Sequence, residues 1–545
     1  MHGVPEIVWD YGLVGACSLV GLKHGEAGRR QYLRWPITTL WTLLVVGLAI
    51  SVLFWAIDAV LGFNFSTHLG FLGYILGMAG GYGAGRYYWA TRGALPDAIP
   101  MRGAMVMDGG KAQAEMREYA EKVRRRPEKM PLTLAGLPMY LEEEGKHFKL
   151  LGTTGTGKST VMRELLHAAL RRGDRAVIAD PDGGYLSRFY DPARGDVILN
   201  PFDARSAKWN LFAELKNAYD VDELAQAFIP DRGSDPTWTN FARTLFTAVT
   251  GQAKALGVTD VGELYRLLVA APKDELQALV AGTPATPFLE AGSDKLFQGT
   301  RSTVTAAVKS LDFIRAQQGK LFSVREWVKE GKGVLFLPYQ ADQISALKAI
   351  ISIWMRLAIF QTMSLGEGDH RIWFAVDELD ALGAINGLPD ALMRLRKFGG
   401  RCVLGLQSIA QASSNYGAGI AQSLIENCGN TLILRCSASE GGGTAQYASK
   451  LIGEREVLRT VYSSSYSRGG MFQGGHSSEG TSDQTATEFA VMPAEIEQLA
   501  DLTGFVKFAS RPGWLRVGFP VYELPRVAAP FEPWVAGGGQ SKNPG

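Results

Sequence analysis

A glycine-rich segment, GTTGTGKST at residues 152–160, restricts this chain to a small group of folds. It fits the pattern G-x-x-x-x-G-K-[ST], follows an apolar run from Phe148 to Leu151, and precedes the helical pattern VMRELLHAALRR. In that setting the backbone N–H groups of the loop and the positive end of the helix bind phosphate groups. The sequence therefore predicts a strand, a phosphate-binding loop and a helix of an α/β sheet.

The loop residues have separate expected roles in holding a nucleotide. We expect Lys158 to reach the β and γ oxygens of ATP and the Ser159 hydroxyl to hold Mg²⁺. The NKxD motif of GTPases and the LSGGQ signature of transporter ATPases do not occur in the sequence. The expected nucleotide-binding residues are Gly152, Thr153, Thr154, Gly155, Thr156, Gly157, Lys158, Ser159 and Thr160.

A second apolar strand, in RIWFAVDELD from Arg371, ends in two carboxylates. A parallel strand delivers such side chains to its C-terminal edge, where ligands bind in open α/β sheets. We expect Asp377 to position Mg²⁺ through water and Glu378 to polarise the attacking water as a general base. Glutamate rather than glutamine at 378 favours hydrolysis over nucleotide sensing. A solvated acidic strand end is the alternative.

The segment LRKFGGRCVLGLQSIAQ adds two further candidates. Its strand, Cys402 to Leu406, ends at Gln407, an amide placed to report the γ-phosphate or to orient water. Four basic residues crowd the preceding loop, and one of them is a candidate arginine finger for a neighbouring subunit's nucleotide. A solvated basic helix end remains open for each of them: Arg394, Arg396, Lys397 and Arg401.

Further strands, among them GVLFLPY, NTLILRC, GFVKFAS and WLRVGF, alternate with helices such as 346–362. This alternation predicts a parallel sheet covered by helices, the RecA-like variety of α/β fold. Lys158 and Glu378 lie farther apart in the sequence than one core requires, so a domain is expected between them. Residues 204–331 show helical spacing without a convincing strand, which predicts an inserted all-α domain. Its Trp238, Phe241 and Arg243 are candidates for stacking bases or touching phosphates, with core packing as the alternative for Phe241.

Two uncharged segments near the start predict a transmembrane hairpin. The run from Ile37 to Ile57 reaches roughly 31 Å as a helix, the thickness of a bilayer core. A shorter glycine-rich run follows from Leu69 to Gly85. Arginine and lysine lie before the first run and after the second but not between them, so both ends are expected in the cytoplasm. The alternative is a buried helical hairpin of a soluble core.

The composition limits how the chain meets its partners. The net charge of +2 excludes a bulk polycation that coats nucleic acid, so any nucleic-acid contact must be local. Four cysteines without a CxxC pair support neither a disulfide framework nor a metal site. A Ser/Gly-rich insert between Tyr462 and Thr485 has few apolar residues to bury, which predicts a mobile loop.

The expected organisation is therefore modular. It comprises a cytoplasmic segment (1–35), a two-helix transmembrane hairpin (36–90), a RecA-like nucleotide-binding domain (100–203 and 332–530), the all-α inserted domain (204–331) and a disordered tail (531–545).

Several longer motifs carry a family resemblance. The stretches LLGTTGTGKST, DPTWTNFART, AVDELDALG, LRKFGGR, GLQSIAQ and VMPAEIEQLADLTGFVKFA resemble the coupling proteins of conjugative type IV secretion, the TraD/TrwB group. The likeness covers about residues 100 to 525, and AVDELDALG with RKFGGR and GLQS is its most specific part. Lys158 and Ser159 match the Walker A pair, Asp377 and Glu378 the Walker B pair, Gln407 the next glutamine, and Arg396 the proposed finger.

The resemblance implies a hexameric ATPase of the bacterial inner membrane, multi-pass with both termini cytoplasmic. Its partners would be single-stranded DNA, a relaxase and the proteins of a type IV secretion channel, with ATP and Mg²⁺ as cofactors. We therefore expect an ATP-driven translocase that delivers relaxase-bound single-stranded DNA during conjugation. Two alternatives remain, an FtsK/HerA-like DNA pump and an ATP-gated receptor for protein substrates. Stimulation of the ATPase by single-stranded DNA discriminates against the receptor.

Overall fold

The computed structural model describes Val60, Ala114 and residues 98–110, 132–230, 236–385, 387–439, 443–467 and 476–534. The predicted cytoplasmic segment 1–35 and both predicted membrane runs, 37–57 and 69–85, lie outside these residues. The chain divides into two compact units, of which the larger comprises Met101–Glu456 and Thr487–Gly545. All of the predicted nucleotide-site residues belong to this larger unit.

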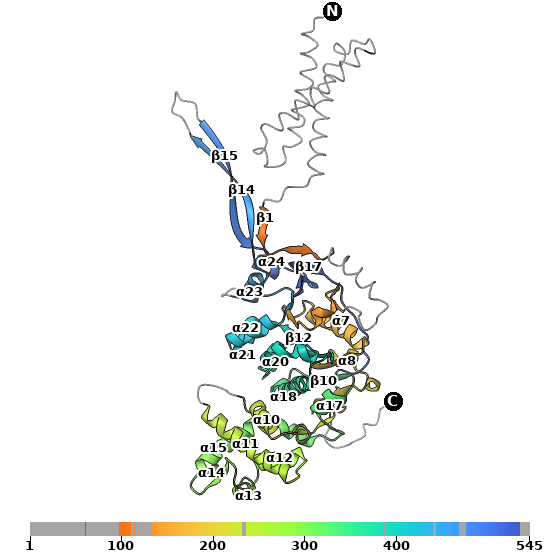
Figure 1. Cartoon of the computed structure of the whole chain (residues 1–545), viewed down its shortest axis with the longest axis vertical. Helices are drawn as coiled ribbons and strands as arrows, with labels where there is room; N and C mark the ends of the chain where they lie inside the picture. Colours follow the sequence, from red (N-terminus) through yellow and green to blue (C-terminus); the bar gives the residue numbers. More distant parts are fainter. Residues whose placement is uncertain are drawn as a thin grey trace, which may run out of the picture. The chain divides into compact units, whose positions relative to one another are not determined.

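A large mixed β-sheet forms the centre of the larger unit (Figure 1). Seven neighbouring strands of this sheet run parallel: β7, β10, β6, β11, β12, β5 and β13. Strand β16 runs antiparallel to both of its neighbours, β13 and β17. The expected α/β core is confirmed, but the expectation of a purely parallel sheet is wrong at this edge. The order is β2 (Val106–Asp108), β17 (Trp514–Gly518), β16 (Thr503–Lys507), β13 (Asn430–Ile433), β5 (Phe148–Leu151), β12 (Gly400–Leu406), β11 (Ile372–Val376), β6 (Arg175–Pro181), β10 (Val334–Tyr339) and β7 (Val197–Ile198).

The central strands are buried on both faces. All residues of β5, β10, β11 and β12 are buried, which explains their nearly continuous apolar sequences. Strand β6, which the sequence reading did not name, lies between β10 and β11. Side chains alternate between the faces, so Ala176 and Ile178 pack in one core with helix α7, and Val177 and Ala179 pack in the other.

Helix α7 (Lys158–Arg171) and helix α18 (Ile344–Met363) belong to these two cores. Among the described residues α18 alone is long and apolar enough to cross a membrane, with a mean hydropathy of 1.4. More than half of that apolar stretch is buried inside the protein, against strands of the sheet and against helices of the region between β7 and β10. Its composition is that of a helix buried on nearly every side.

A helical region follows β7 in the chain, and its helices gather at one end of the larger unit (Figure 1). The expected absence of strands is wrong in one detail, because β8 (Lys208–Trp209) and β9 (Leu321–Phe322) form a short parallel pair. The helices are α9 (Leu211–Glu214), α10 (Tyr219–Phe228), α11 (Thr237–Ala255), α12 (Val261–Val269), α13 (Lys273–Leu279), α14 (Thr286–Leu289), α15 (Asp294–Ala307), α16 (Lys309–Ala316) and α17 (Val324–Glu330).

The aromatic candidates of this region contact other side chains. The Phe241 ring lies 5.2 Å from that of Phe288 and 6.0 Å from that of Trp238, measured between centroids. Arg243 donates from Nε to the carbonyl oxygen of Ile229 at 2.8 Å. Phe241 therefore packs in the helical region, whereas Trp238 keeps 44% of its surface exposed.

The Ser/Gly-rich insert was expected to be a mobile loop, and this expectation is wrong for most of it. Strands β14 (Glu454–Ser467) and β15 (His476–Phe489) form a sheet in the order β1-β14-β15, with β1 at Ala98–Gly103. Backbone N–H and C=O groups pair strands without requiring buried apolar side chains, which is why a low apolar content did not exclude them. Residues 468–475 lie outside the described part of the chain.

The C-terminal tail also departs from the expectation of disorder at its beginning. Asp203 and Pro533 form a β-bridge, Trp534 donates its N–H to the carbonyl oxygen of Phe202 at 2.8 Å, and Ala204 donates to that of Glu532 at 2.8 Å. Residues 531–534 are therefore held to the main unit by backbone hydrogen bonds, and residues 535–545 lie outside the described part.

Candidate active site

The phosphate-binding loop connects the end of β5 to the start of α7. Gly155 and Gly157 adopt φ values of +81° and +116°, a left-handed conformation that favours glycine. Lys158, the first residue of α7, is buried and donates from Nζ to the carbonyl oxygens of Gly152 at 2.5 Å and Thr153 at 3.0 Å. Burial lowers the pKa of Lys158, while Asp377 and Glu378 act in the opposite direction. The ammonium group thus lies folded onto the loop, next to two carboxylates.

Ser159 and Asp377 meet as the sequence predicted. The Ser159 hydroxyl donates to Asp377 Oδ2 at 2.6 Å, and the Tyr185 hydroxyl donates to the same oxygen at 2.8 Å. The other carboxylate oxygen, Oδ1, is buried and has no hydrogen-bond partner in the described part of the chain. A hydroxyl oxygen beside a carboxylate oxygen that lacks a donor fits Mg²⁺, which takes one or two protein ligands together with phosphate and water oxygens.

Glu378 and Gln407 also come together, because β11 and β12 are neighbouring parallel strands. Gln407 donates from Nε2 to Glu378 Oε1 at 2.9 Å, and its Oε1 accepts from the Thr154 hydroxyl at 3.2 Å. Burial and the nearby Asp377 raise the pKa of Glu378, which makes this carboxylate a stronger base than an exposed one. The amide therefore links the candidate base to the phosphate-binding loop.

Asp380, which is not among the expected site residues, supports this arrangement. Its Oδ2 accepts from the backbone N–H groups of Gln407 at 3.1 Å and Ser408 at 3.4 Å. Burial raises the pKa of Asp380. The fourth residue of the DELD motif thus fixes the turn that carries Gln407.

A cavity of about 400 Å³ lies at the phosphate-binding loop. It brings together the predicted loop residues, the two carboxylates and the glutamine, and four further side chains complete its wall. The lining residues are Thr154, Gly155, Gly157, Lys158, Ser159, Thr160, Arg163, Asp377, Glu378, Gln407, Asp501, Leu502 and Val521. Gly152, Thr153 and Thr156 do not line the cavity but form hydrogen bonds within the loop, since the carbonyl oxygens of Gly152 and Thr153 accept from Lys158 and that of Thr153 also accepts from the Thr156 hydroxyl. Among the described residues no cluster of three or more His, Cys, Asp or Glu side chains could hold a metal ion.

Two further residues outside the predicted set, Asp180 and Tyr185, hold the Asp377 carboxylate in place. Asp180, at the end of β6, is fully buried and accepts from the backbone N–H groups of Tyr185 at 2.9 Å and Leu186 at 2.6 Å. Burial raises the pKa of Asp180 to about 7. The Asp180 carboxylate thereby fixes the turn that presents the Tyr185 hydroxyl to Asp377. The stretch DPDGGY after an apolar run is the sequence signal that marks this turn.

Arg396 lies elsewhere. It belongs to a short 3-10 helix (Leu395–Phe398) just before β12 begins, is exposed, and has its side chain beside Gly145, just before β5 begins. The cavity lies where β5, β11 and β12 end. Arg396 therefore lies at the amino ends of the strands, whereas the cavity lies at their carboxyl ends, and Arg396 does not line the cavity.

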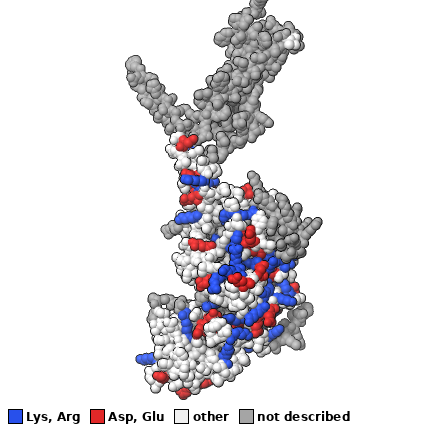
Figure 2. Space-filling view, viewed as in Figure 1, with Lys and Arg blue, Asp and Glu red and all other residues white. Residues whose placement is uncertain are grey.

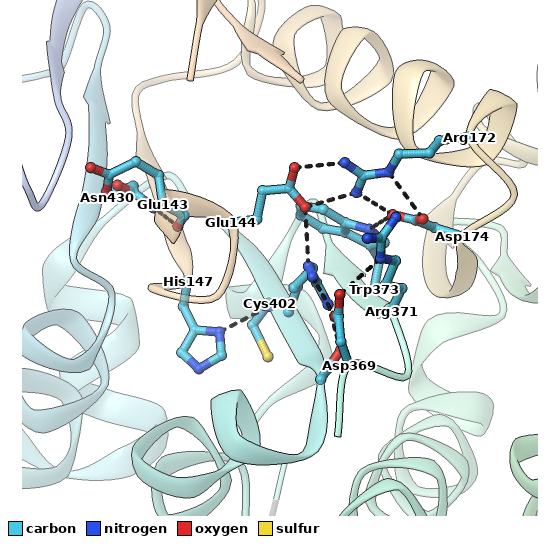
Figure 3. Close-up of polar contacts among 12 residues, drawn as sticks. Glu143, Glu144, His147, Arg172, Asp174, Asp369, Arg371, Trp373, Cys402 and Asn430 are labelled. Carbon is cyan, nitrogen blue, oxygen red and sulfur yellow. Dashed lines mark hydrogen bonds and ion pairs between the residues drawn. The ribbon is translucent and has the colours of Figure 1, made fainter. Parts of the chain in front are cut away.

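Arg401, another candidate finger, is buried in an ion-pair network at the same amino ends. It donates from Nη2 to Asp369 Oδ1 at 2.7 Å, from Nε to Glu144 Oε2 at 3.3 Å, and from Nη1 to the carbonyl oxygen of Gly399. Figure 3 shows Glu144 facing Arg172, which also pairs with Asp174. Arg401 is thereby excluded as a finger, because it is 6% exposed and already paired.

His147 joins the amino ends of the strands to the helix before Arg396. Its Nδ1 accepts from the backbone N–H of Cys402 at 3.1 Å (Figure 3), and its Nε2 bonds to the carbonyl oxygen of Leu392 at 3.0 Å. Burial lowers the pKa of His147 to about 4, so the ring is neutral with its proton on Nε2. It fixes helix α20 (Leu388–Arg394), which leads directly into the Arg396 turn.

A protein-family model described as "Type IV secretion-system coupling protein DNA-binding domain" matches residues 131–520. The chain belongs to this family. The resemblance inferred from the motifs is thus confirmed, and the match includes both the sheet and the helical region.

Curated members of the family align with parts of this coupling protein. "Coupling protein TraD" of Escherichia coli K12 is 31% identical over 411 residues, which are 74% of this chain and 56% of TraD. "Protein VirD4" of Rhizobium radiobacter is 25% identical over 194 residues, 35% of this chain and 27% of VirD4. The chain thus matches only about half, or less, of the length of these relatives.

A solved structure of the conjugative coupling protein TrwB matches with a TM-score of 0.69 and 31% identity, over 81% of this chain and 98% of that one. Other TrwB structures with the same score and identity are complexes with ADP and Mg²⁺ and with the ATP analogue ADPNP. The RecA-like core fold expected from the sequence is confirmed by this match.

Proposed function

We propose that this chain is an ATP-driven DNA translocase, anchored in the bacterial inner membrane, that delivers relaxase-bound single-stranded DNA to a type IV secretion channel. The observation that carries the proposal is the convergence of Lys158, Ser159, Asp377, Glu378 and Gln407 on one cavity. These side chains are the parts that phosphoryl transfer to water requires: a phosphate cradle, a metal site and a positioned base.

In the proposed mechanism the loop N–H groups and Lys158 hold the phosphates of ATP. Lys158 leaves the carbonyl oxygens of Gly152 and Thr153 and turns its ammonium group to the β and γ oxygens. Ser159 and Asp377 hold Mg²⁺, which neutralises charge that develops on those oxygens. Glu378 accepts the proton of the attacking water, and Gln407 senses the γ-phosphate through its contacts with Glu378 and Thr154. The TrwB complexes with ADP and Mg²⁺ and with ADPNP support this assignment of nucleotide and metal.

We further propose that the active form is a homo-hexamer in which Arg396 acts on the nucleotide of a neighbouring subunit. Arg396 is exposed and lies at the amino ends of the strands, so it is available to another subunit but not to its own cavity. An arginine supplied in trans stabilises the charge of the transition state. Membrane anchoring by 37–57 and 69–85, with both termini in the cytoplasm, completes the proposal.

The motor is tested with two substitutions in the full chain. Lys158→Thr removes the phosphate-binding ammonium and Glu378→Gln removes the base, so each should abolish ATP hydrolysis and DNA transfer while membrane insertion persists. DNA transfer that survives either change would remove the motor from the proposal. ATP hydrolysis by the parent chain that single-stranded DNA fails to stimulate would favour the protein-receptor alternative.

Mixed assemblies test the finger. Lys158→Thr subunits keep Arg396 but lack a working cavity, and Arg396→Ala subunits have the reverse defect. Each variant alone should be inactive, and mixing them should restore part of the hydrolysis because an intact cavity then meets an intact arginine. Mixtures that stay inactive contradict a role in trans.

A further inference from the structure

A groove of about 720 Å³ lies in the larger unit and shares no lining residue with the nucleotide cavity. Its walls come from the end of α10, from α11, α15 and α16, and from the first turns of α18. The lining residues are Phe228, Ile229, Pro230, Thr239, Ser302, Thr303, Ala306, Ala307, Lys309, Ser310, Phe313, Ser345, Ala346, Lys348 and Ala349.

The charge of this groove is one-sided. Lys309 and Lys348 are exposed and line it, and none of its lining residues, all of them described, is acidic. Figure 2 shows Lys and Arg interspersed with Asp and Glu over much of the visible face. The groove also receives the positive end of α18, since Ser345 and Ala346 are the second and third residues of that twenty-residue helix. These charges favour an anionic occupant.

A buried hydroxyl in the groove lacks a partner. Ser310 is 4% exposed, and its Oγ forms no hydrogen bond within the described part of the chain. Buried polar groups in proteins are nearly always paired, because leaving one unpaired costs free energy. A phosphate oxygen entering the groove would supply the missing acceptor and would also pair with the lysine ammonium groups.

Part of the groove lining is apolar and aromatic. Phe228, Ile229 and Pro230 form this part together with the half-buried Phe313, whose ring also packs against that of Phe202 with the centroids 4.9 Å apart. An aromatic face next to basic side chains is the combination by which proteins hold single-stranded nucleic acid, with a base stacked on the ring and the backbone on the cations. The volume of the groove is sufficient for a nucleotide unit.

We propose that this groove is a binding subsite for single-stranded DNA, in which Ser310, Lys309 and Lys348 hold the phosphate backbone and Phe313 contacts a base. The proposal rests on the proposed function, since it assumes that the chain binds single-stranded DNA at all. It assigns that binding to a defined groove of the helical region, whereas the net charge of +2 indicated only that any contact with nucleic acid must be local.

The salt dependence of binding tests the lysines. The full chain in detergent is titrated against a fluorescein-labelled oligothymidylate, and the affinity is measured by anisotropy at several salt concentrations. The double variant Lys309→Gln/Lys348→Gln should reduce the slope of log affinity against log salt by roughly 1.4, since each single-strand phosphate contact contributes roughly 0.7. Lys320→Gln/Lys329→Gln removes the same charge from exposed positions outside the groove and should leave the slope unchanged.

The hydroxyl is tested separately. Ser310→Ala should weaken oligothymidylate binding roughly tenfold, because a hydrogen bond to a charged group is lost from the complex and none is lost from the free protein. Thr250→Val is the matched control, since the Thr250 hydroxyl is also buried without a described partner but does not line the groove. Its binding should equal that of the parent chain.

The outcomes separate this proposal from the proposed function. A parent chain that binds no oligothymidylate overturns both. A parent chain that binds it, with groove variants that behave as their controls do, overturns the groove and leaves the translocase standing. Groove variants that weaken the binding of free ADP but not of the oligothymidylate also overturn the proposal, because the occupant is then a mononucleotide.

Discussion

Replacing Tyr185 by phenylalanine tests how the Asp377 carboxylate is held for the proposed Mg²⁺. The Tyr185 hydroxyl donates to Asp377 Oδ2 at 2.8 Å, and burial raises the pKa of this tyrosine well above its ordinary value, so it remains a donor at any working pH. Tyr185→Phe removes only that oxygen and leaves the ring in its buried position. Asp377 Oδ2 then keeps a single donor, the Ser159 hydroxyl at 2.6 Å.

The expected magnitude follows from the kind of bond that is lost. A hydrogen bond to a charged group contributes about 1.5–3 kcal/mol, and groups that orient a metal ligand typically change metal affinity by roughly 10–100-fold when removed. We therefore expect the Mg²⁺ concentration that gives half-maximal ATP hydrolysis to rise by roughly 10–100-fold in Tyr185→Phe. Hydrolysis at saturating Mg²⁺ should stay close to that of the parent chain, because Glu378 and Gln407 are untouched.

The assay is ATP hydrolysis at fixed ATP with increasing Mg²⁺. Tyr339→Phe is the matched control, because the Tyr339 hydroxyl is also buried but has no hydrogen-bond partner in the described part of the chain. That variant should titrate like the parent chain. If Tyr185→Phe has the same Mg²⁺ midpoint as Tyr339→Phe, the hydroxyl does not position Asp377 and the reasoning fails.

Three further predictions concern the phosphate-binding loop and the opposite end of the strands. Gly157→Ala places a Cβ at φ +116° and 2.9 Å from Leu502 Cδ2, so nucleotide affinity measured by calorimetry should fall sharply; unchanged affinity contradicts the loop geometry. The pKa of His147 is lowered to about 4 from 6.5, so the unfolded chain binds the extra proton, and the contribution of His147 to stability should fall by up to about 3 kcal/mol as pH drops from 6.5 to 4. Asp180, whose pKa burial raises to about 7, contributes in the opposite direction over this range, so the effect of His147 is the difference between the parent chain and His147→Gln in denaturant unfolding. Glu144→Gln removes the charge that pairs with Arg172 while Asp174 still pairs with it, and should cost about 1.5–3 kcal/mol, seen as a lower melting temperature that the exposed Glu142→Gln does not share.

The sequence was most informative where burial on both faces leaves a simple pattern. Strands β5, β11 and β12 are buried and mostly apolar, and each is followed by polar residues that a parallel sheet presents at the carboxyl ends of its strands. Lys158, Asp377 and Gln407 could therefore be placed together from the sequence, and the structure brings them to one cavity.

Contacts that depend on strand neighbours could not be predicted in this way. Tyr185 reaches Asp377 only because β6 lies beside β11, and nothing in the local sequence fixes that neighbour. Arg401 looked like a candidate finger because its charge suggested exposure, whereas Glu144 and Asp369 neutralise it inside the protein. Pairing partners distant in the sequence leave no trace in local composition.

The prediction that the Ser/Gly-rich insert is a mobile loop was wrong for a different physical reason. A low apolar content predicts mobility only for segments that need a hydrophobic core, and β14 and β15 are joined through their backbones. Composition describes side chains, so it cannot report on hydrogen bonds that every residue except proline is able to make.

Helix α18 has a mechanical consequence. Its first turns line the groove, and its length packs against the sheet that carries Glu378 and Gln407 at one edge. An α-helix of twenty residues is a rod roughly 30 Å long that resists both stretching and bending, since every turn is tied to the next. A force applied at the groove end of α18 is transmitted along the helix to the sheet. A load on single-stranded DNA held in the proposed groove would therefore displace the sheet that carries Glu378 and Gln407.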